Sequence, residues 1–548
     1  MLIKLIMIAL FFAVTIAVGV ANARAAKGVD GFVLGGRSVG PWLTAFSFGT
    51  SYFSAVIFIG YAGRFGWNFG LASTWVGLGN AFLGSLLAWM VLGRRTRIMT
   101  QHLGSRTMPD FFGLRYQSKA LRLVAAIIVF IFLMPYTASL FNGLAWLFGQ
   151  SFPAIDYIWW IVIMSVLTGV YVILSGYVGS AVNNFIQGIV MLVGIVAVIG
   201  AVMADNGGLT EAIAKLSETS ATTAAGTEFR GAYTSFLGPH PLQLLGVVVL
   251  TSLGTWGLPQ MVGKFYAIKD EGAIKKGTVI STFFGLVVAG GCYFLGGFGR
   301  LYADSITMNA AGTAPASFDT IIPAMLSALE RSLGTGGTWL IGLVLMLVLA
   351  ASMSTLSSLA MTSASTITLD LILPMMKKNK DDKRRMLIMR LIVAVSIVIA
   401  AAIAMLVVSN KELAGKLYIS DLMGISWGAL AGCFLAPFLY GLFWKKVTRP
   451  AVWASFVTGL GITVTQFVLN AVCKITFENP VLAYFCGSSI NAGMLAMLVG
   501  LVIVPVVSLL TRKQIPDGVD GMFAGYNREV KVSMKLALES AEDASAQA

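Results

Sequence analysis

The stretch TSLGTWGLP, from Thr251 to Pro259, interrupts an apolar segment that is otherwise long enough to cross a membrane. Proline removes a backbone hydrogen-bond donor and clashes with the carbonyl four residues before it, and Gly254 and Gly257 favour an unwound turn. A helix break at membrane depth persists only where it is buried in protein or lines a cavity. The stretch therefore predicts a membrane helix with an interior-facing break, with a simple proline kink as the alternative.

Two other apolar segments carry a similar signal. FSFGTSYFSAVIFIGYAG, from Phe46 to Gly63, places Gly49 among hydroxyl side chains, although small-residue packing between helices is an alternative interpretation. AASMSTLSSLAMTSASTITLD, from Ala350 to Asp370, has Ser or Thr at nearly half of its positions. Several of these hydroxyls recur at three- and four-residue steps, so one stripe of the helix is expected to face the protein interior.

The composition agrees with a membrane protein. Of the 548 residues, 57% are hydrophobic and 11% are charged, whereas about a quarter of the residues of a soluble domain are charged. A single hydrophobic core stops growing at about 250–300 residues, so the apolar excess must face a lipid bilayer. We therefore predict an all-α polytopic membrane protein.

Apolar stretches of at least about 18 residues predict about thirteen transmembrane helices. They are 3–23, 41–65, 70–94, 120–149, 157–176, 178–203, 241–267, 278–301, 337–373, 385–409, 418–444, 451–473 and 492–511. The first could be a signal peptide, but its apolar region is long for one, and an uncleaved span is the favoured interpretation.

The positive charges follow this division. With the N-terminus outside and the C-terminus cytoplasmic, 28 of the 38 Lys and Arg fall in cytoplasmic segments and nine in outside segments. Such an excess is typical of the cytoplasmic side of membrane proteins. The net charge of +14 is therefore interpreted as a topology signal of a multi-pass plasma-membrane protein, with no nucleic-acid partner. In this count Lys264 belongs to a cytoplasmic loop.

The reactive side chains are few. Four cysteines and two histidines show no metal-ligand spacing, so metal and thiol chemistry are not expected. No paired carboxylates and no nucleophile with a base occur at membrane depth, so no enzyme activity is expected. Cys473 and Cys486 flank one loop and could pair in an oxidising space. Asp370 and Asp421 lie near span ends, where we expect them to bind helix termini or water.

The apolar residues of 318–329 predict a surface helix packed on the bundle, with an extracellular lid as the alternative.

The interrupted segments occupy matching places in the chain. The spans of 41–203 and of 241–444 form two runs of five, and an odd number of spans places the two runs in opposite orientation. Interrupted helices at corresponding positions of inverted halves indicate a transporter site near the membrane midplane. Unwound carbonyls together with hydroxyls supply the oxygen ligands that sodium requires.

Six motifs resemble the sodium:solute symporter family, whose members carry proline, pantothenate, sialic acid, sugars or short monocarboxylates. They are FVLGGRSVGPW (32–42), MPDFFGLRY (108–116), SGYVGSAVNNFIQGIVMLVG (175–194), WGLPQ (256–260), MSTLS (353–357) and SWGALAGCFLAPFLYGLFWKKVTR (426–449). The family implies a LeuT-type fold built from two inverted five-helix repeats. The implied division is 1–40 (a leading helix and cytoplasmic loop), 41–203 (first repeat), 204–240 (extracellular loop), 241–444 (second repeat), 445–512 (two trailing helices) and 513–548 (cytoplasmic tail).

The resemblance also implies site residues. The family's common sodium site corresponds to the carbonyls of Gly49, Tyr52 and Ala351 and the hydroxyls of Ser354 and Thr355. Some members bind a second sodium ion through a carboxylate in the sixth span. Asn184 stands at that position here, so the second ion site is degenerate and one coupled sodium ion is expected.

The expected solute pocket is apolar with hydroxyls. Sugar carriers place carboxylates or amides where this chain has Val56, Trp75 and Ser252, which disfavours a sugar. Free backbone donors at helix breaks favour a carboxylate. The residues expected to line the pocket are Ser51, Phe53, Val56, Thr255 and Trp256, and the gate candidates are Tyr136 and Trp427.

These features predict a sodium-coupled symporter that imports a small organic solute by alternating access. The solute is expected to bear a carboxylate, as proline, pantothenate and monocarboxylates do, and the protein is expected to act as a monomer in the lipid bilayer. Thr255 stands where proline carriers have an aromatic residue, which speaks against proline itself. A proton-coupled carrier of the same fold and a membrane-embedded sodium sensor are the alternatives.

Overall fold

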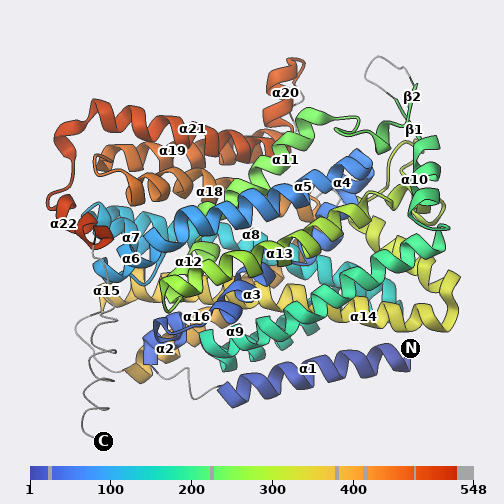
Figure 1. Ribbon diagram of the computed structural model, residues 1–548, viewed down its shortest axis with the longest axis horizontal. Helices are drawn as coiled ribbons and strands as arrows, with labels where there is room; N and C mark the ends of the chain where they lie inside the picture. Colours follow the sequence, from blue (N-terminus) through green and yellow to red (C-terminus); the bar gives the residue numbers. More distant parts are fainter. Residues whose placement is uncertain are drawn as a thin grey trace, which may run out of the picture.

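The computed structural model describes residues 1–22, 28–222, 228–376, 382–410, 417–473, 475 and 477–527. Most of them form long helices that run along the long axis of one bundle (Figure 1). The first half contains α1 (Leu2–Asn22), α2 (Gly28–Leu34), α3 (Pro41–Tyr52), α4 (Ala62–Phe69), α5 (Thr74–Gly79), α6 (Arg94–Leu103), α7 (Met108–Arg115), α8 (Lys119–Ser151), α9 (Tyr157–Asp205) and α10 (Leu209–Glu218). The second half contains α11 (Pro241–Leu253), α12 (Pro259–Ala267), α13 (Glu271–Gly296), α14 (Ile321–Thr366), α15 (Leu373–Met375), α16 (Asp382–Ser409), α18 (Ile419–Phe443), α19 (Arg449–Phe467), α20 (Pro480–Cys486), α21 (Ser489–Leu510) and α22 (Val519–Ala524).

Eleven helical runs within the described residues are long and apolar enough to cross a membrane, compared with about thirteen predicted spans. The second predicted span is broken after Tyr52, and its remainder continues with the third as the single run Val56–Leu103. Tyr157–Ile173 is apolar but shorter than a full span. The fold is therefore the predicted all-α membrane bundle, and the two counts differ only at these breaks.

Local sequence explains where many helices begin and bend. Ser118, Asp156, Asp270 and Ser488 each accept a backbone N–H in the first turn of the helix that follows, which satisfies donors that have no helical partner. The long helix α9 is interrupted at Gly176, whose φ of 57° and ψ of −170° lie outside the helical region. That break coincides with the predicted boundary between the fifth and sixth spans.

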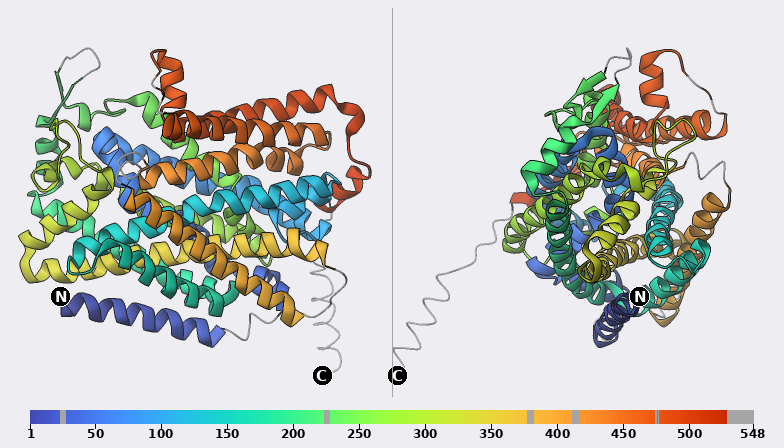
Figure 2. Two further views of the ribbon diagram at one scale, coloured as in Figure 1. Left: turned by 180° about the vertical axis from the view of Figure 1, so that it is seen from behind. Right: turned by 90° about the vertical axis from the view of Figure 1, so that its right-hand side faces the viewer.

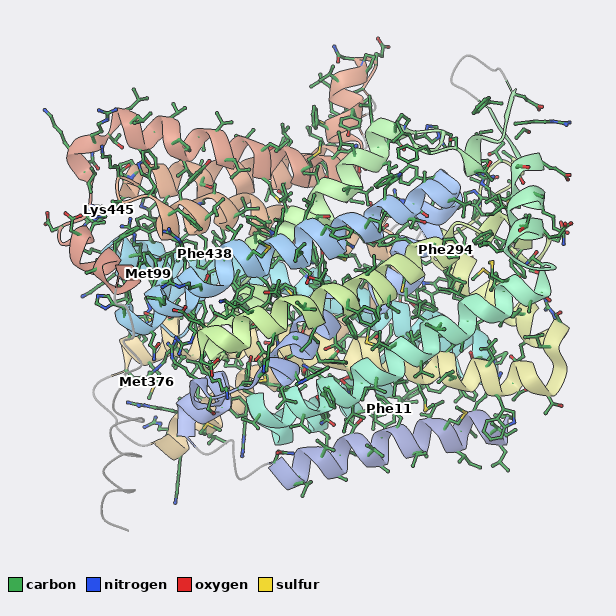
Figure 3. The ribbon with its side chains drawn as sticks, in the orientation of Figure 1. Phe11, Met99, Phe294, Met376, Phe438 and Lys445 are labelled. Carbon is green, nitrogen blue, oxygen red and sulfur yellow. The ribbon has the colours of Figure 1, made fainter. Side chains whose placement is uncertain are left out.

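The two ends of the bundle differ. The hairpin β1–β2 (Ser220–Thr222 with Glu228–Arg230) and α10 lie at the same end of the bundle as Met1, whereas α6, α7 and α22 lie at the opposite end (Figures 1 and 2). We call these the α10 end and the α22 end. Lys445 lies at the α22 end, where it pairs with Asp520 at 2.6 Å (Figure 3). Opposite positions of Met1 and α22 agree with an odd number of membrane crossings.

The surface helix predicted within 318–329 is present. Ile321 begins α14, and the apolar side chains of its first turns are buried against the bundle. Gly334, with φ 57° and ψ −125°, separates these turns from the long membrane-spanning part of the same helix. The segment is therefore a packed helix in this structure.

Cys473 and Cys486 are free thiols, so the disulfide considered from the sequence is absent from the structure.

The leading helix α1 packs against α9 and α14 at the edge of the bundle. Its Phe11 is buried, whereas most of its other large apolar side chains are exposed, as expected of a surface in contact with lipid (Figure 3). Lys4 pairs with Glu330 of α14 at 2.7 Å, and this ion pair fixes the α10 end of the helix to the bundle.

Helices α4 and α13 cross at backbone contact. A Cβ atom at Gly66 would lie 2.1 Å from the carbonyl carbon and oxygen of Gly296, and a Cβ at Gly296 would lie 2.1 Å from the Ala62 carbonyl oxygen. Small residues allow helices in membranes to approach in this way. The position of α4, which follows the first helix break, therefore depends on these glycines.

We predict that Gly296→Val will destabilise the folded protein by about 2 kcal/mol or more, because the added atoms overlap backbone that cannot move without separating α4 from α13. Gly290→Ala, on the same helix, is the control, since a Cβ there meets no atom within 4 Å. Thermal unfolding of the two detergent-solubilised variants measures the difference. Equal melting temperatures would contradict the importance of this crossing.

Candidate functional site

The first helix break lies between α3 and the helical run that starts at Val56. The Phe53 amide donates to the Gly49 carbonyl at 3.0 Å, and Phe53 itself leaves the helical path, with φ −101° and ψ 97°. The carbonyls of Thr50 and Ser51 therefore lie where the α3 hydrogen-bond ladder ends. Every residue from Thr44 to Tyr52 is buried.

Two hydroxyls of α14 meet this break. Ser354 Oγ lies 3.0 Å from both the Thr50 and the Ala351 carbonyl oxygens. Thr355 Oγ1 lies 3.0 Å from the Ala351 oxygen, 3.2 Å from the Thr50 oxygen and 3.4 Å from the Ser51 oxygen. Five neutral oxygen atoms thus converge in a fully buried place.

This donor set suits a sodium ion, because carbonyl and hydroxyl oxygens ligate a hard cation without adding formal charge. Ala351, Ser354 and Thr355 come together as the resemblance implied. In α3, the carbonyls that accept the hydroxyls of Ser354 and Thr355 are those of Thr50 and Ser51. These two residues lie between Gly49 and Tyr52, whose carbonyls were expected. The ligand set carried over from the family remains a prediction, and Thr50 and Ser51 are added to it as candidates.

The second helix break lies between α11 and α12, as TSLGTWGLP predicted. Helix α11 ends at Leu253, a tight 3₁₀ turn covers Gly254–Trp256, and α12 begins at Pro259. Thr255 Oγ1 donates to the Gly84 carbonyl at 3.1 Å, and Trp256 Nε1 donates to the Leu83 carbonyl at 3.0 Å. The second break is therefore tied to the Val56–Leu103 run.

The residues expected to line the solute pocket surround the two breaks. Ser51, Val56, Phe53, Thr255 and Trp256 are all buried. The hydroxyl of Tyr52 donates to the Thr251 carbonyl, which connects α3 to the second break. No described contact tests whether these side chains hold a solute, so their role remains a prediction.

An aromatic group adjoins the first break. The rings of Tyr52 and Phe53 stack at a centroid distance of 4.3 Å, and Trp427 of α18 lies 6.0 Å from Tyr52. Tyr136 of α8 meets Trp427 edge-on at 5.9 Å. The two gate candidates are therefore neighbours, and they contact the group that ends α3.

Trp75 lies elsewhere. Its side chain is 37% exposed, and its indole N–H donates to the Phe236 carbonyl at 2.9 Å. The sequence argument placed Trp75 at the pocket, whereas the buried polar side chain beside Ser252 is Asn80, whose Oδ1 accepts the Ser252 hydroxyl at 3.2 Å. An amide is thus available beside a pocket for which the sequence predicted apolar walls and hydroxyls.

Lys264 is the polar residue that sequence reasoning missed. It is 6% exposed in α12, and its Nζ donates to Ser47 Oγ at 3.0 Å and to Ser358 Oγ at 2.9 Å. The assignment of Lys264 to a cytoplasmic loop is wrong, because α12 continues to Ala267 and carries the side chain into the bundle. The available signal was its place inside the predicted 241–267 span, since ionisable residues in spans are usually functional.

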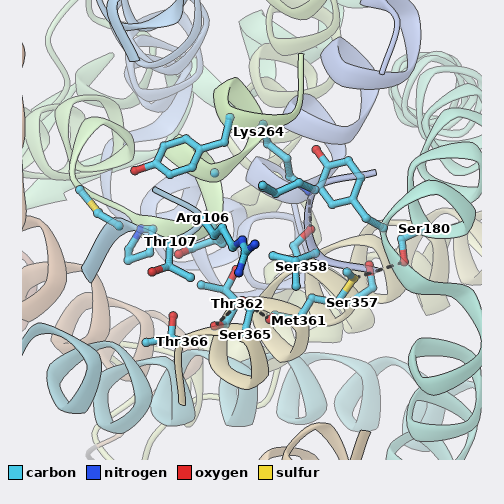
Figure 4. A pocket seen from close by; sticks show the side chains of 18 of the residues that line it. Arg106, Thr107, Ser180, Lys264, Ser357, Ser358, Met361, Thr362, Ser365 and Thr366 are labelled. Carbon is cyan, nitrogen blue, oxygen red and sulfur yellow. Dashed lines mark hydrogen bonds between the residues drawn. The ribbon is translucent and has the colours of Figure 1, made fainter. Parts of the chain in front are cut away.

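Lys264 also lines a cavity of about 60 Å³, which can hold a few water molecules. The cavity reaches Arg106 and Thr107, in and beside the turn between α6 and α7 (Figure 4). Hydroxyls of α14, among them Ser358 and Thr362, form another wall. A polar path thus leads from the first break toward the α22 end.

Partly buried ion pairs join helices near both ends of the bundle. Arg64 of α4 pairs with Asp421 of α18 at 2.9 Å. Arg122 pairs with Asp370 at 2.9 Å and with Asp110 at 3.1 Å. The prediction that Asp370 and Asp421 bind helix termini or water is wrong, because tertiary packing supplies each carboxylate with an arginine from a distant segment.

These features have counterparts among known proteins. The model of the sodium:solute symporter family matches residues 32–459. Sodium/proline symporters of Staphylococcus aureus, for example those of strains JH9 and NCTC 8325 / PS 47, are 27% identical over 468 residues, covering 83% of this chain and 84% of theirs.

Solved structures show the same fold. A Na+-coupled sialic acid symporter in a substrate-bound outward-open state matches with a TM-score of 0.69, at 16% identity over 93% of this chain and 98% of that one. MhsT in complex with L-phenylalanine matches with a TM-score of 0.51, at 15% identity over 86% and 98% of the two chains. The molecule is therefore a multi-pass membrane transporter of the LeuT fold. The chain belongs to the sodium:solute symporter family.

We predict that Arg122→Gln will destabilise the protein by about 3 kcal/mol, because it leaves the fully buried Asp370 carboxylate without its cation. Glu271→Gln is the matched control. It breaks the Arg94–Glu271 pair, whose side chains are almost half exposed, and should cost less than about 1 kcal/mol. Thermal unfolding in detergent provides the comparison, and a similar loss in both variants would contradict the special role of the buried pair.

Proposed function

We propose that the protein is a sodium-coupled symporter that imports a small carboxylate-bearing organic solute across the plasma membrane by alternating access. The observation that carries this proposal is the convergence of the Ser354 and Thr355 hydroxyls on the free carbonyls at the end of α3. Membership of the sodium:solute symporter family supports the transport of a solute coupled to an ion. The neutral oxygen atoms at the break support sodium as that ion.

Sodium binding at this place joins two elements. The ion would be held by backbone carbonyls from the α3 break, with Gly49 and Tyr52 as the expected pair, and by Ala351, Ser354 and Thr355 of α14. Bound sodium thereby stabilises one relative position of the two helices. A ligand shifts a conformational equilibrium only by its differential affinity for the two states, and a site shared between two helices provides that difference.

The solute site is proposed beside this ion. Ser51, Phe53, Val56, Thr255 and Trp256 give it apolar walls and hydroxyls, and the exposed backbone donors at the helix breaks suit a carboxylate. The S. aureus relatives are named for sodium and proline, which supports an amino-acid-sized solute. Asn80 beside Ser252 offers a further hydrogen-bonding group for a polar solute.

The ion pairs near the two ends provide closures for alternating access. We assign Arg64 and Asp421 to the outer closure and Arg122 and Asp370 to the inner one, with the N-terminus outside and the C-terminus cytoplasmic. Cavities of about 90 and 200 Å³ adjoin Arg64. The smaller cavity beside Lys264 is lined by Thr107, whose hydroxyl donates to Asp370 at 2.6 Å, so space near each closure can widen on opening. Tyr136 and Trp427 are the proposed inner lining of the outer closure.

The driving force is sufficient for accumulation. One positive charge that crosses a potential of 100 mV releases about 2.3 kcal/mol, which corresponds to roughly fiftyfold accumulation of solute before any sodium gradient is added.

Proton coupling in the same fold remains the second candidate, because Lys264 places an ionisable side chain next to the proposed site. Monomers are proposed to be sufficient for transport.

We predict that an imposed sodium gradient will drive uptake by purified protein in proteoliposomes. The panel is labelled proline, pantothenate, lactate, acetate and glucose, and a carboxylate-bearing member should accumulate whereas glucose should not. Replacement of external sodium by choline at constant pH should abolish uptake. Uptake that survives in choline and responds to a proton gradient would instead establish the proton-coupled alternative.

We predict that the double variant Ser354→Ala with Thr355→Ala will raise the sodium concentration for half-maximal binding by at least about tenfold, since two oxygen ligands are lost. Ser396→Ala is the control, because within the described part of the chain the hydroxyl of that buried serine donates to a carbonyl of its own helix, that of Ile392, at 2.8 Å. Equilibrium binding of ²²Na⁺ to the purified variants gives both values. An unchanged affinity in the double variant would remove these hydroxyls from the sodium site.

A further inference from the structure

Lys264 brings a side-chain amine into the polar core of the bundle. Its Nζ donates to Ser47 Oγ of α3 and to Ser358 Oγ of α14 (Figure 4). The ammonium also lies 5.5 Å from the centre of the Tyr177 ring. Within the described part of the chain, no carboxylate lies within 4 Å of it, so hydroxyl oxygens alone hold this cation.

The two serines connect Lys264 with both places where sodium ligands are expected. Ser358 Oγ lies 2.7 Å from Ser51 Oγ, and the Ser51 carbonyl accepts the Thr355 hydroxyl at 3.4 Å. In the other direction, Ser47 Oγ accepts the Asn184 side-chain N–H at 2.9 Å. Lys264 thus stands between the proposed sodium site and the amide that replaces the carboxylate of a second site.

The oxygen atoms around Lys264 are of the kind that a second cation would use. Ser47 and Ser358 are buried hydroxyls, and the Asn184 Oδ1 atom is buried without a hydrogen-bond partner among the described residues. The ammonium of lysine is a compact point charge with three donors, so it takes the lone pairs that a sodium ion would otherwise take. A mobile cation and the ammonium cannot share these oxygens.

Charge repulsion reinforces this exclusion. Ser358 follows Ser354 by four residues on one helix, so the ammonium bound to Ser358 lies about one helical turn, or roughly 5–6 Å along the axis, from the proposed sodium site. At that separation two like charges in a partly buried environment oppose each other strongly. With a neutral Asn184 nearby, nothing in the cluster offsets an additional positive ion.

We propose that Lys264 is a built-in cation that takes the place of a second sodium ion between α3, α9, α12 and α14. Its charge limits the transporter to one bound sodium ion in each cycle. This inference rests on the proposed sodium-coupled function and extends it, because it assigns the ion stoichiometry to a particular side chain. Lys264 acts as a positioning and specificity-determining residue, since it contacts the network and is not itself a ligand of the ion.

The test is the number of ²²Na⁺ ions bound at saturation by the purified full-length protein. We expect one ion for the unaltered protein, for Lys264→Arg and for Asn184→Asp, whose new carboxylate would pair with Lys264. The double variant Lys264→Met with Asn184→Asp removes the fixed cation and supplies a carboxylate, and it should bind two ions. Lys445→Met, at an exposed position, is the control for loss of a lysine elsewhere and should bind one.

A folded double variant that binds one ion with unchanged affinity would overturn the inference, and so would two ions bound by the unaltered protein. Should the double variant fail to fold, Lys264→Met alone decides. Removal of the charge should lower the sodium concentration for half-maximal binding roughly tenfold or more, and an unchanged value would refute the proposal. Absence of any sodium binding by the unaltered protein would instead overturn the proposed sodium coupling.

Discussion

Helix α3 ends in the middle of the bundle, where water cannot satisfy the carbonyls that its last turn leaves free. In such surroundings each unsatisfied backbone group costs several kcal/mol. Ser354 and Thr355 meet the carbonyl of Thr50 at 3.0 and 3.2 Å and thereby make the break tolerable. The same oxygens provide a place for a cation, so the solution to a folding problem is also the basis of the proposed ion site.

The rest of the structure maintains this meeting of α3 and α14. Gly66 and Gly296 let α4 and α13 touch through their backbones, which positions the chain immediately after the break. Partly buried arginine–carboxylate pairs connect distant segments near both ends, whereas the polar side chains that are buried between them are mainly hydroxyls and amides. Lys264 differs from them, because its contacts with Ser47 and Ser358 place an ionisable amine beside the proposed ion site.

Much of the fold could be predicted, because membrane spans are local features of hydropathy and helix breaks are local features of Gly and Pro. The span boundaries, the break at Thr251–Pro259 and the break at Gly176 all depend on residues close in sequence. The meeting of Ser354 and Thr355 with the end of α3 was also within reach through the resemblance to a family. The location of Trp75 and the partners of Asp370 were not, since they depend on which helices pack together and in what rotation.

The sequence alone determined that the chain is a helical membrane protein with interrupted helices and a hydroxyl-rich interior stripe, because lipid imposes hydrophobic length and backbone satisfaction on every span. Only the tertiary structure decided which oxygens converge and which charges are paired. Lys264 illustrates the reason, because it lies three residues before the end of a predicted span. A side chain at that place can belong either to the loop or to the core. The packing of α12 against α3 and α14 brings its ammonium to Ser47 and Ser358, and no one-dimensional pattern contains that contact.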